Sequence, residues 1–414
     1  MNFNNFIYKI NIFGFCILVI LPILFVIGTS IANIGISILS LIFLLNLNRQ
    51  NFKKYIINPF VPPFLVLCIY FIVLSLLSDN PLFSLQSSLF YCRFIFFSLC
   101  IWLLLDKFFE YIKYFTFILL LLYCFILIDS YFQYFVGFNI IGNEYNGVRL
   151  SGIFGDEFIL GSFLSRMMPI LFASCLLTFN KNNKFIYFLS FLLIATDVLI
   201  YISGERLAFF YITLITLLFV FLISRWKLIR FTTFIISLCI IAFISISNSE
   251  IKKRMIQDTI DQSNIFGEEK IVFTSEHQVL YANAIDIYKD NIFFGIGPKM
   301  FRIYCDYAKY KKRFGCSTHP HNTYLQLLVE TGIIGFLCFT LIFVFISSYF
   351  IYHAYSMYIL KKPYFSDYQV FLLIAVFITL WPFSPTSNFF SSSICIIYYL
   401  PVGFLLNSFY KEKK

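Results

Sequence analysis

Long apolar stretches, separated by short polar breaks, run through most of the chain. A membrane-spanning helix needs about 20 apolar residues. Twelve segments fit that length: 9–28, 31–47, 60–78, 87–105, 114–135, 158–179, 185–203, 207–223, 229–247, 333–353, 368–382 and 392–409. The first two form one run broken only at Gly28-Thr29-Ser30, so eleven spans is the alternative. The pattern predicts an all-α polytopic membrane protein with about 12 transmembrane helices.

Composition and charge support this interpretation. The chain is 60% hydrophobic and 13% charged, whereas a soluble domain has about 25% charged residues. On one predicted side, basic residues gather in short loops and in the C-terminal tail: Arg49, Lys53, Lys54, Lys107, Lys113, Lys181, Lys184, Arg225, Lys227, Arg230, Lys361, Lys362, Lys411, Lys413 and Lys414. Cytoplasmic loops carry such an excess, so we expect both termini in the cytoplasm. The net charge of +10 then needs no nucleic acid as partner.

This topology divides the chain into three parts. Residues 1–247 carry helices one to nine, 248–332 form one large outward loop, and 333–414 carry the last three helices. The loop is too long to be a plain connector. We expect short helices within it at Lys252–Asp261 and at Gln278–Tyr288.

Two arginines mark the outward ends of predicted spans. Arg206 follows Ser203-Gly204-Glu205, and an arginine at membrane depth usually pairs or lines a cavity. Its guanidinium could bind phosphate; snorkelling, or a pair with Glu205, is the alternative. Arg149 opens the glycine-rich RLSGIFG, a candidate re-entrant segment or an ordinary loop. Arg93 and Arg166, inside apolar runs, are weaker candidates.

Polar chemistry concentrates between Gly295 and Phe336. Asn322 is expected to cap a helix of about nine residues that ends at Gly332. His321 would then precede the positive end of the helix dipole, which favours a neutral imidazole able to accept a proton. His319 lies two residues before it, and His277 lies on the predicted loop helix or is simply a solvated histidine.

Two of the eleven cysteines, Cys305 and Cys316, flank a polar loop, and the other nine lie in apolar runs. These two thiols could bind zinc together with His319 and His321, but the spacing of the four residues fits no common zinc pattern. Outside the cytoplasm the thiols would oxidise together. We therefore expect a Cys305–Cys316 disulfide.

Several blocks together resemble the bacterial O-antigen ligase and polymerase superfamily. The main one is His321-Asn322 followed, after nine residues, by Gly332-x-x-Gly335. The other blocks, in matching order, are RLSGIF with Gly161, SGER, GIGPKMFR, and Trp381-Pro382 with Asn388-Phe389-Phe390. The chain differs from many members in having His277 where a second arginine often stands, and Phe336 after the last glycine.

The resemblance implies a glycosyltransferase of the bacterial inner membrane, with its active site facing the periplasm and no metal or other cofactor. It implies that His321 is the catalytic base and that Arg206 holds the diphosphate of an undecaprenyl-diphosphate-linked glycan. Arg149, Arg302 or His277 would supply the second cation, and His319 and Asn322 would support His321. The acceptor would be lipid A-core in a ligase, which the His321 spacing favours, or another lipid-linked glycan in a polymerase. A transporter or flippase is the alternative of a different class.

Overall fold

The structure, a computed structural model, describes residues 3–179, 185–263 and 274–411, and these residues form helices joined by loops. No β-strand occurs in these ranges, apart from an isolated bridge between Phe138 and Glu144. The apolar half of the chain contains α1 (Phe3–Ile27), α2 (Thr29–Asn46), α3 (Arg49–Ile56), α4 (Val61–Leu77), α5 (Pro81–Phe108), η1 (Phe109–Tyr111), α6 (Ile112–Val136), η2 (Gly152–Phe154), α7 (Leu160–Thr178), α8 (Phe185–Ile202), α9 (Arg206–Leu222) and α10 (Lys227–Ser247). The all-α prediction is confirmed.

The remaining helices form the loop after α10 and the C-terminal part. They are α11 (Ser249–Lys252), the π-helical turn η3 (Lys253–Gln257), α12 (Asp258–Ser263), α13 (Ser275–Asp290), α14 (Phe301–Tyr304), α15 (Thr323–Tyr358), α16 (Asp367–Thr379) and α17 (Ser392–Lys411). Both short helices predicted in this loop are present. The first is part of a helical run from α11 to α12, and the second is longer than expected.

Seven helical segments of the described chain are long and apolar enough to cross a membrane, one of which, Pro81–Val136, contains both α5 and α6. Four shorter apolar helices accompany them: Val61–Leu77, Arg206–Leu222, Asp367–Thr379 and Ile394–Tyr410. Each of the twelve predicted spans coincides with a helix. The protein is therefore an integral membrane protein by its helices, and the count of twelve crossings stays a prediction.

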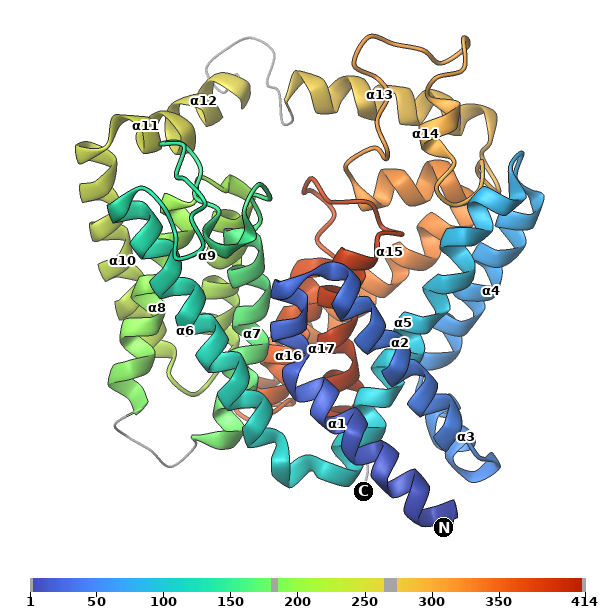
Figure 1. The fold of residues 1–414 in the computed structure, drawn as a ribbon, viewed down its shortest axis with the longest axis horizontal. Coiled ribbons are helices and arrows are strands. Elements are labelled where there is room, and N and C mark those ends of the chain that lie inside the picture. Colours follow the sequence, from blue (N-terminus) through green and yellow to red (C-terminus); the bar gives the residue numbers. More distant parts are fainter. Residues whose placement is uncertain (1–2, 180–184, 264–273, 412–414) are drawn as a thin grey trace.

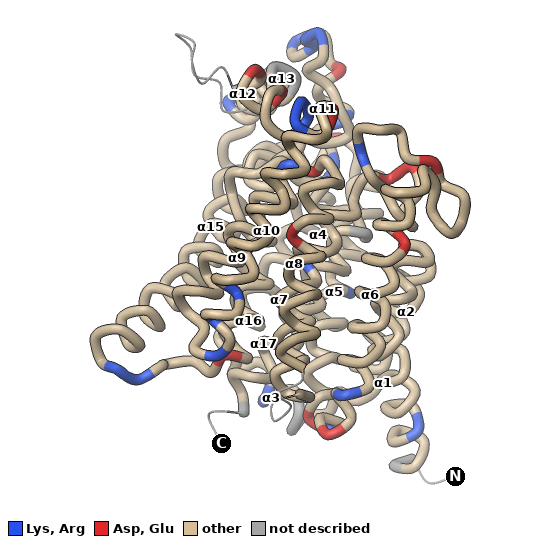
Figure 2. The backbone as a smooth tube through the Cα atoms, turned by 90° about the vertical axis from the view of Figure 1, so that its left-hand side faces the viewer, with Lys and Arg blue, Asp and Glu red and all other residues tan. Residues whose placement is uncertain are grey.

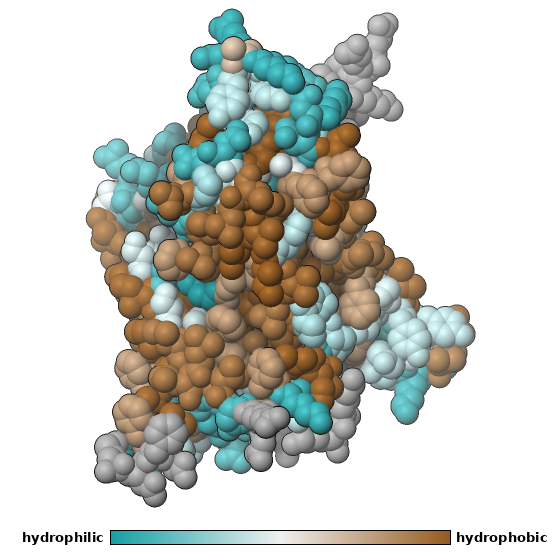
Figure 3. Space-filling model, turned by 90° about the vertical axis from the view of Figure 1, so that its right-hand side faces the viewer, coloured by the Kyte–Doolittle hydropathy of each residue, from teal (hydrophilic) through white to brown (hydrophobic). Residues whose placement is uncertain are grey.

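The helices stand roughly side by side, with both termini at one end and α11 to α14 at the other (Figure 1). Charged residues gather at these two ends of the backbone (Figure 2). Between them, the face over α4 and α5 is largely hydrophobic (Figure 3). Inside, α5 packs against α2, α4 and α17, while α7 packs against α6, α9 and α16. This layout suits a belt of lipid around the middle of the molecule.

Several residues of the basic-loop pattern lie on helices, among them Arg49, Lys53 and Lys54 on α3, and Arg230 is also fully buried. Arg230 is not in a loop: it lies in the first turn of α10, fully buried, and both of its terminal nitrogens donate to the carboxylate of Asp197 in α8, at 2.7 and 2.9 Å. Ser237 donates to the same carboxylate at 3.0 Å. A buried arginine is tolerated when it is paired and hydrogen-bonded in this way. Lys181, Lys184, Lys413 and Lys414, also part of that pattern, lie outside the described residues.

The segment before α14 crosses the first part of α15, and two glycines, Gly295 and Gly332, lie at the crossing. The backbone N–H groups of Ile296 and Gly297 donate to the carbonyls of Val329 and Glu330, at 3.1 and 2.9 Å. A Cβ on Gly295 would lie 2.6 Å from the Gly332 nitrogen, and one on Gly332 would lie 2.1 Å from the Phe293 carbonyl oxygen. Both glycines also have φ of +66°, which other residues adopt at a cost. The predicted break at Gly332 is present, but it is a kink, because α15 continues to Tyr358.

Candidate active site

The helix that follows His321 begins as the sequence predicts. The side-chain oxygen of Asn322 accepts hydrogen bonds from the backbone N–H groups of Tyr324 and Leu325, both at 3.0 Å. This is the N-cap arrangement, which satisfies two of the free N–H groups at a helix start. The side-chain amide of Asn322 donates to the Pro382 carbonyl at 2.9 Å. Asn322 therefore fixes both the helix start and its position against the loop before α17.

His321 sits next to this cap in a strained conformation. Its φ is +56°, a region that non-glycine residues seldom occupy and that often marks functional sites. The backbone N–H of Thr386 donates to the His321 carbonyl at 2.8 Å, which holds this conformation. The His321 Nε2 lies 3.2 Å from the Ser317 hydroxyl, and the His277 ring meets the His321 ring edge-on with centroids 5.7 Å apart.

His319 supports this arrangement and is not free to act as a base itself. Its Nε2 is 3.1 Å from the Thr386 carbonyl and its Nδ1 is 2.9 Å from the Thr318 hydroxyl. Because a carbonyl oxygen only accepts, Nε2 carries the proton and Nδ1 accepts from Thr318. Its ring centroid lies 4.1 Å from that of His321. His319 thus braces His321 while both of its nitrogens are engaged.

Both histidines are held neutral, and the main cause is burial. Burial, followed by the nearby His321, lowers the pKa of His319 to about 4. Burial, followed by the nearby His277, also lowers the pKa of His321. The sequence predicted a neutral His321 from the helix dipole. The direction agrees, whereas the causes are desolvation and a neighbouring histidine.

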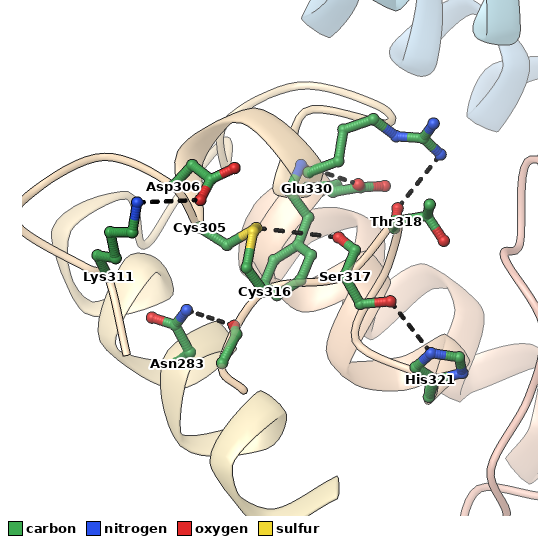
Figure 4. The surroundings of a disulfide bond; sticks show 12 residues. Asn283, Cys305, Asp306, Lys311, Cys316, Ser317, Thr318, His321 and Glu330 are labelled. Carbon is green, nitrogen blue, oxygen red and sulfur yellow. Dashed lines mark hydrogen bonds and ion pairs between the residues drawn. A yellow bond between two sulfur atoms is a disulfide. The ribbon is translucent and has the colours of Figure 1, made fainter. Parts of the chain in front are cut away.

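A disulfide joins Cys305 and Cys316, whose Cα atoms are 5.0 Å apart, directly before the residue that contacts His321 (Figure 4). The Ser317 carbonyl oxygen lies 3.8 Å from the Cys305 sulfur. The side-chain amide of Asn283, on α13, donates to the Gly315 carbonyl at 2.6 Å. The segment that carries Ser317 is therefore tied to α13 and α14 immediately before the histidines.

Arg206 begins α9 at the same end of the molecule, and it does not pair with Glu205. The Glu205 carboxylate accepts hydrogen bonds from the backbone N–H groups of Gly161 and Ser162 at the start of α7, at 2.6 and 3.0 Å. Arg206 donates to the side-chain oxygen of Gln262 at 2.7 Å and lies 3.9 Å from Asp258, both on α12. The half-buried guanidinium thus has one distant carboxylate partner within ion-pair range among the described residues.

Two further arginines surround this position. Arg149 and Arg254 both lie beside Gly204, where a Cβ would be 3.5 Å from the Cγ of each. Arg254 donates to the Gly204 carbonyl at 3.3 Å, and Arg149 donates to the Phe158 carbonyl at 3.0 Å. Both are close enough for their charges to act on Arg206. We call Arg149, Arg206 and Arg254 the arginine cluster.

Arg302 does not join this cluster. It lies on α14, donates to the Thr318 carbonyl at 3.3 Å, and its charge contributes to the lowered pKa of His319. The structure thus places Arg302 with His319, His321 and His277, and Arg149 with Arg206. The segment around Arg149 forms an irregular loop with the single short turn η2, and it contains no re-entrant helix.

The loop between α16 and α17 connects the two groups. In Figure 1, α9 and α12 lie on one side and α13 to α15 on the other, with this loop, drawn in red, between them. The Ser384 hydroxyl lies 2.7 Å from the hydroxyl of Tyr211, which is on α9, and Thr386 bonds His319 and His321 as described above. One loop therefore contacts both the helix that begins with Arg206 and the segment that carries His321.

Sequence reasoning missed Arg254, Ser317 and Thr386. The basic run Lys252-Lys253-Arg254 was visible, but nothing local shows that its third member turns toward Arg206. Ser317 and Thr386 carry no pattern of their own, since their roles depend on loops meeting in space. Within the described ranges, no group of three His, Cys, Asp or Glu side chains is arranged to hold a metal ion.

Comparison with known proteins gives one match. A sequence model of the family described as O-antigen ligase matches residues 188–340, from α8 to the middle of α15. The matched segment contains Arg206, Arg254, His277, the disulfide and His321. No curated protein matches the chain. The match supports the resemblance of this chain to the O-antigen ligase and polymerase superfamily of membrane proteins.

Proposed function

We propose that the protein is an O-antigen ligase-type glycosyltransferase of the bacterial inner membrane. In this proposal it moves a glycan from undecaprenyl diphosphate to a sugar hydroxyl of lipid A-core. Both termini are cytoplasmic, and the end that carries α11 to α14 faces the periplasm. The observation that carries the proposal is that one loop contacts both the segment of the neutral His321 and α9, the helix that begins with Arg206 of the arginine cluster.

His321 would be the general base. A base must be unprotonated at the working pH and must have a free ring nitrogen. Burial lowers the pKa of His321, and the hydrogen bond at Ser317 can keep the proton on Nε2, which leaves Nδ1 to accept the proton of the acceptor hydroxyl. The oxygen of that hydroxyl then forms the new bond to the anomeric carbon.

The arginine cluster would stabilise the leaving group. As the bond from the anomeric carbon to the phosphate oxygen breaks, negative charge develops on the diphosphate. Guanidinium groups bind phosphate oxygens through two parallel N–H bonds. Arg206, with Arg149 and Arg254, offers three such groups, so Arg254 and Arg149 take the place that the sequence left open between Arg149, Arg302 and His277. One displacement inverts the anomeric carbon.

The acceptor decides between ligase and polymerase. Purified protein would receive one lipid-linked glycan donor and two competing acceptors, lipid A-core and a second lipid-linked repeat, and the products would be separated by mass. Transfer to lipid A-core supports the proposal. Transfer to the second repeat alone would make the protein a polymerase. Absence of both products, with a donor of the native glycan, would contradict the glycosyltransferase assignment.

A further inference from the structure

A second arginine is buried at membrane depth, and it lacks the partner that Arg230 has. Arg166, in the middle of α7, is 6% exposed, whereas Arg230 is 0% exposed. Arg230 has the Asp197 carboxylate at 2.7 Å. Arg166 has the Ser162 carbonyl at 3.3 Å and the face of the Tyr211 ring at 4.8 Å, and its side chain also hydrogen-bonds the Tyr398 hydroxyl. No carboxylate lies within ion-pair range of Arg166 among the described residues.

A buried charge without a counter-charge is costly and usually has a function. A carbonyl, a neutral hydroxyl and an aromatic ring carry no negative charge, so they offset only part of the cost of removing a guanidinium from water. Because the fold tolerates this cost at Arg166 and avoids it at Arg230, the missing counter-charge at Arg166 should come from a ligand.

Arg166 lines a cavity that reaches the candidate active site. The cavity holds about 180 Å³, which is far more than the roughly 15 Å³ that one water requires. Its polar lining includes Ser162, Arg166 and Thr386, the last of which bonds both His319 and His321. Leu207, the neighbour of Arg206, forms part of the wall. The cavity therefore lies between the arginine cluster and the histidines.

The rest of the lining indicates what kind of anion fits. Phe25, Phe163, Ile394 and Ile397 make much of the wall apolar, and the only acidic residue in it, Glu157, is exposed and forms no ion pair with Arg166. Arg166 lies one helical turn beyond Ser162, and thus deeper along α7 than the Glu205 contact. An anion that reaches this depth must be attached to a hydrocarbon chain, and a phosphate matches the guanidinium fork.

We propose that this cavity is a second phosphate site, in which Arg166 binds a phosphate of a polyprenyl diphosphate below the arginine cluster. The inference rests on the proposed function, because the donor is what brings such a lipid to the cavity. Arg166 would approach the diphosphate from the membrane side, while Arg206 and its neighbours approach from the outer side. The lipid would thus be held between charges at two depths.

Binding of farnesyl diphosphate, a short polyprenyl diphosphate without a glycan, tests the site without requiring transfer. We expect Arg166→Gln to weaken binding to the full-length protein by about 10- to 100-fold, the usual effect of losing a charged hydrogen bond. Binding of farnesol should not change. Arg93→Gln is the matched control, since Arg93 is half-buried, donates to Asn33 and Ser392 and does not line the cavity.

Unchanged binding of farnesyl diphosphate by Arg166→Gln would overturn the inference. So would an equal loss for farnesol, or a loss that affects inorganic diphosphate and spares the farnesyl compound. If the wild-type protein bound no farnesyl diphosphate at all, the proposed donor would itself be wrong. The two failures are therefore distinguishable.

Thermal unfolding without ligand gives an independent test if Arg166→Gln accumulates poorly. Removing an uncompensated buried charge relieves its cost, so Arg166→Met should unfold at or above the wild-type temperature. Arg230→Met should unfold at a lower temperature, because it leaves Asp197 buried without its partner. A loss in Arg166→Met as large as that in Arg230→Met would make Arg166 a structural residue and overturn the inference.

Discussion

The two groups of candidate site residues are built on opposite electrostatic principles. Around His321, burial and hydrogen bonds keep the imidazoles uncharged, and both nitrogens of His319 are already used. Around Arg206, the positive charges of Arg149 and Arg254 lie close enough to act on it, while the buried Glu205 is bound to the start of α7. The first group is prepared to take up a proton, and the second to take up negative charge. In the proposed displacement, both changes happen in the same step.

Removing the base should have the largest effect. His321→Ala deletes the proposed proton acceptor, so the transfer rate should fall by about 10²–10⁴-fold, measured with purified protein and lipid-linked donor. His353→Ala is the matched control. His353 is also buried, but it lies far along α15 from His321 and contacts the Leu222 carbonyl at the end of α9. Transfer at a normal rate by folded His321→Ala would rule out the base assignment.

Replacing one guanidinium of the arginine cluster by an ammonium group should have a smaller effect, which should be confined to the use of the donor. Arg206→Lys keeps the charge but loses the planar fork, so kcat/KM for the donor should fall by about 10- to 100-fold. Affinity for the acceptor should stay unchanged. Arg225→Lys, which changes an arginine just beyond the opposite end of α9, should behave as wild type. A near-normal value for Arg206→Lys would make Arg206 a structural residue.

The pH dependence should separate the two groups further. Protonation removes the base, so the rate falls as pH drops through the lowered pKa of His321, below the ordinary value of about 6.5. Arginines do not titrate in this range, so donor affinity should stay flat. A pH–rate profile on the wild-type protein measures this. A rate that already declined above pH 6.5, about the unperturbed value, would contradict a neutral, buried base.

The same titration predicts a stability effect. The unfolded chain binds a proton at His319 near pH 6.5, whereas the folded protein binds it only near pH 4. Stability should therefore decrease as pH falls from about 6.5 to about 4, and His319→Gln should reduce this slope in thermal unfolding. A slope unaffected by His319→Gln would show that other groups cause it.

The smallest effect should come from the disulfide. Its closed loop of 11 residues limits the entropic stabilisation to about 3 kcal/mol. The double variant Cys305→Ser with Cys316→Ser should keep the fold and lose less than about tenfold in rate, because Asn283 still ties the segment to α13. Denaturant unfolding and transfer measure the two quantities. A loss of transfer rate as large as that of His321→Ala would show that the disulfide by itself, without help from Asn283, positions His321.

The sequence predicted what depends on neighbouring residues. Apolar length located every long helix, and the cap at Asn322 followed from the residue order around it. Prediction from the sequence failed where two segments that are distant in the chain meet. Arg230 was assigned to a loop because its partner, Asp197, lies 33 positions away. An aspartate in one apolar run and an arginine in another were a visible signal of that pair. Arg254 beside Gly204 and Thr386 beside His321 gave no such signal.

The crossing at Gly295 and Gly332 has a consequence for anyone who surveys variants of this chain. Neither glycine has a side chain to offer a substrate, yet the smallest replacement would place a carbon inside the opposing backbone. The start of α15, with His321 before it, would then be displaced. In a mutational scan scored by activity alone, both positions would be as intolerant as the catalytic histidine. A parallel score for protein abundance would distinguish a damaged scaffold from lost chemistry.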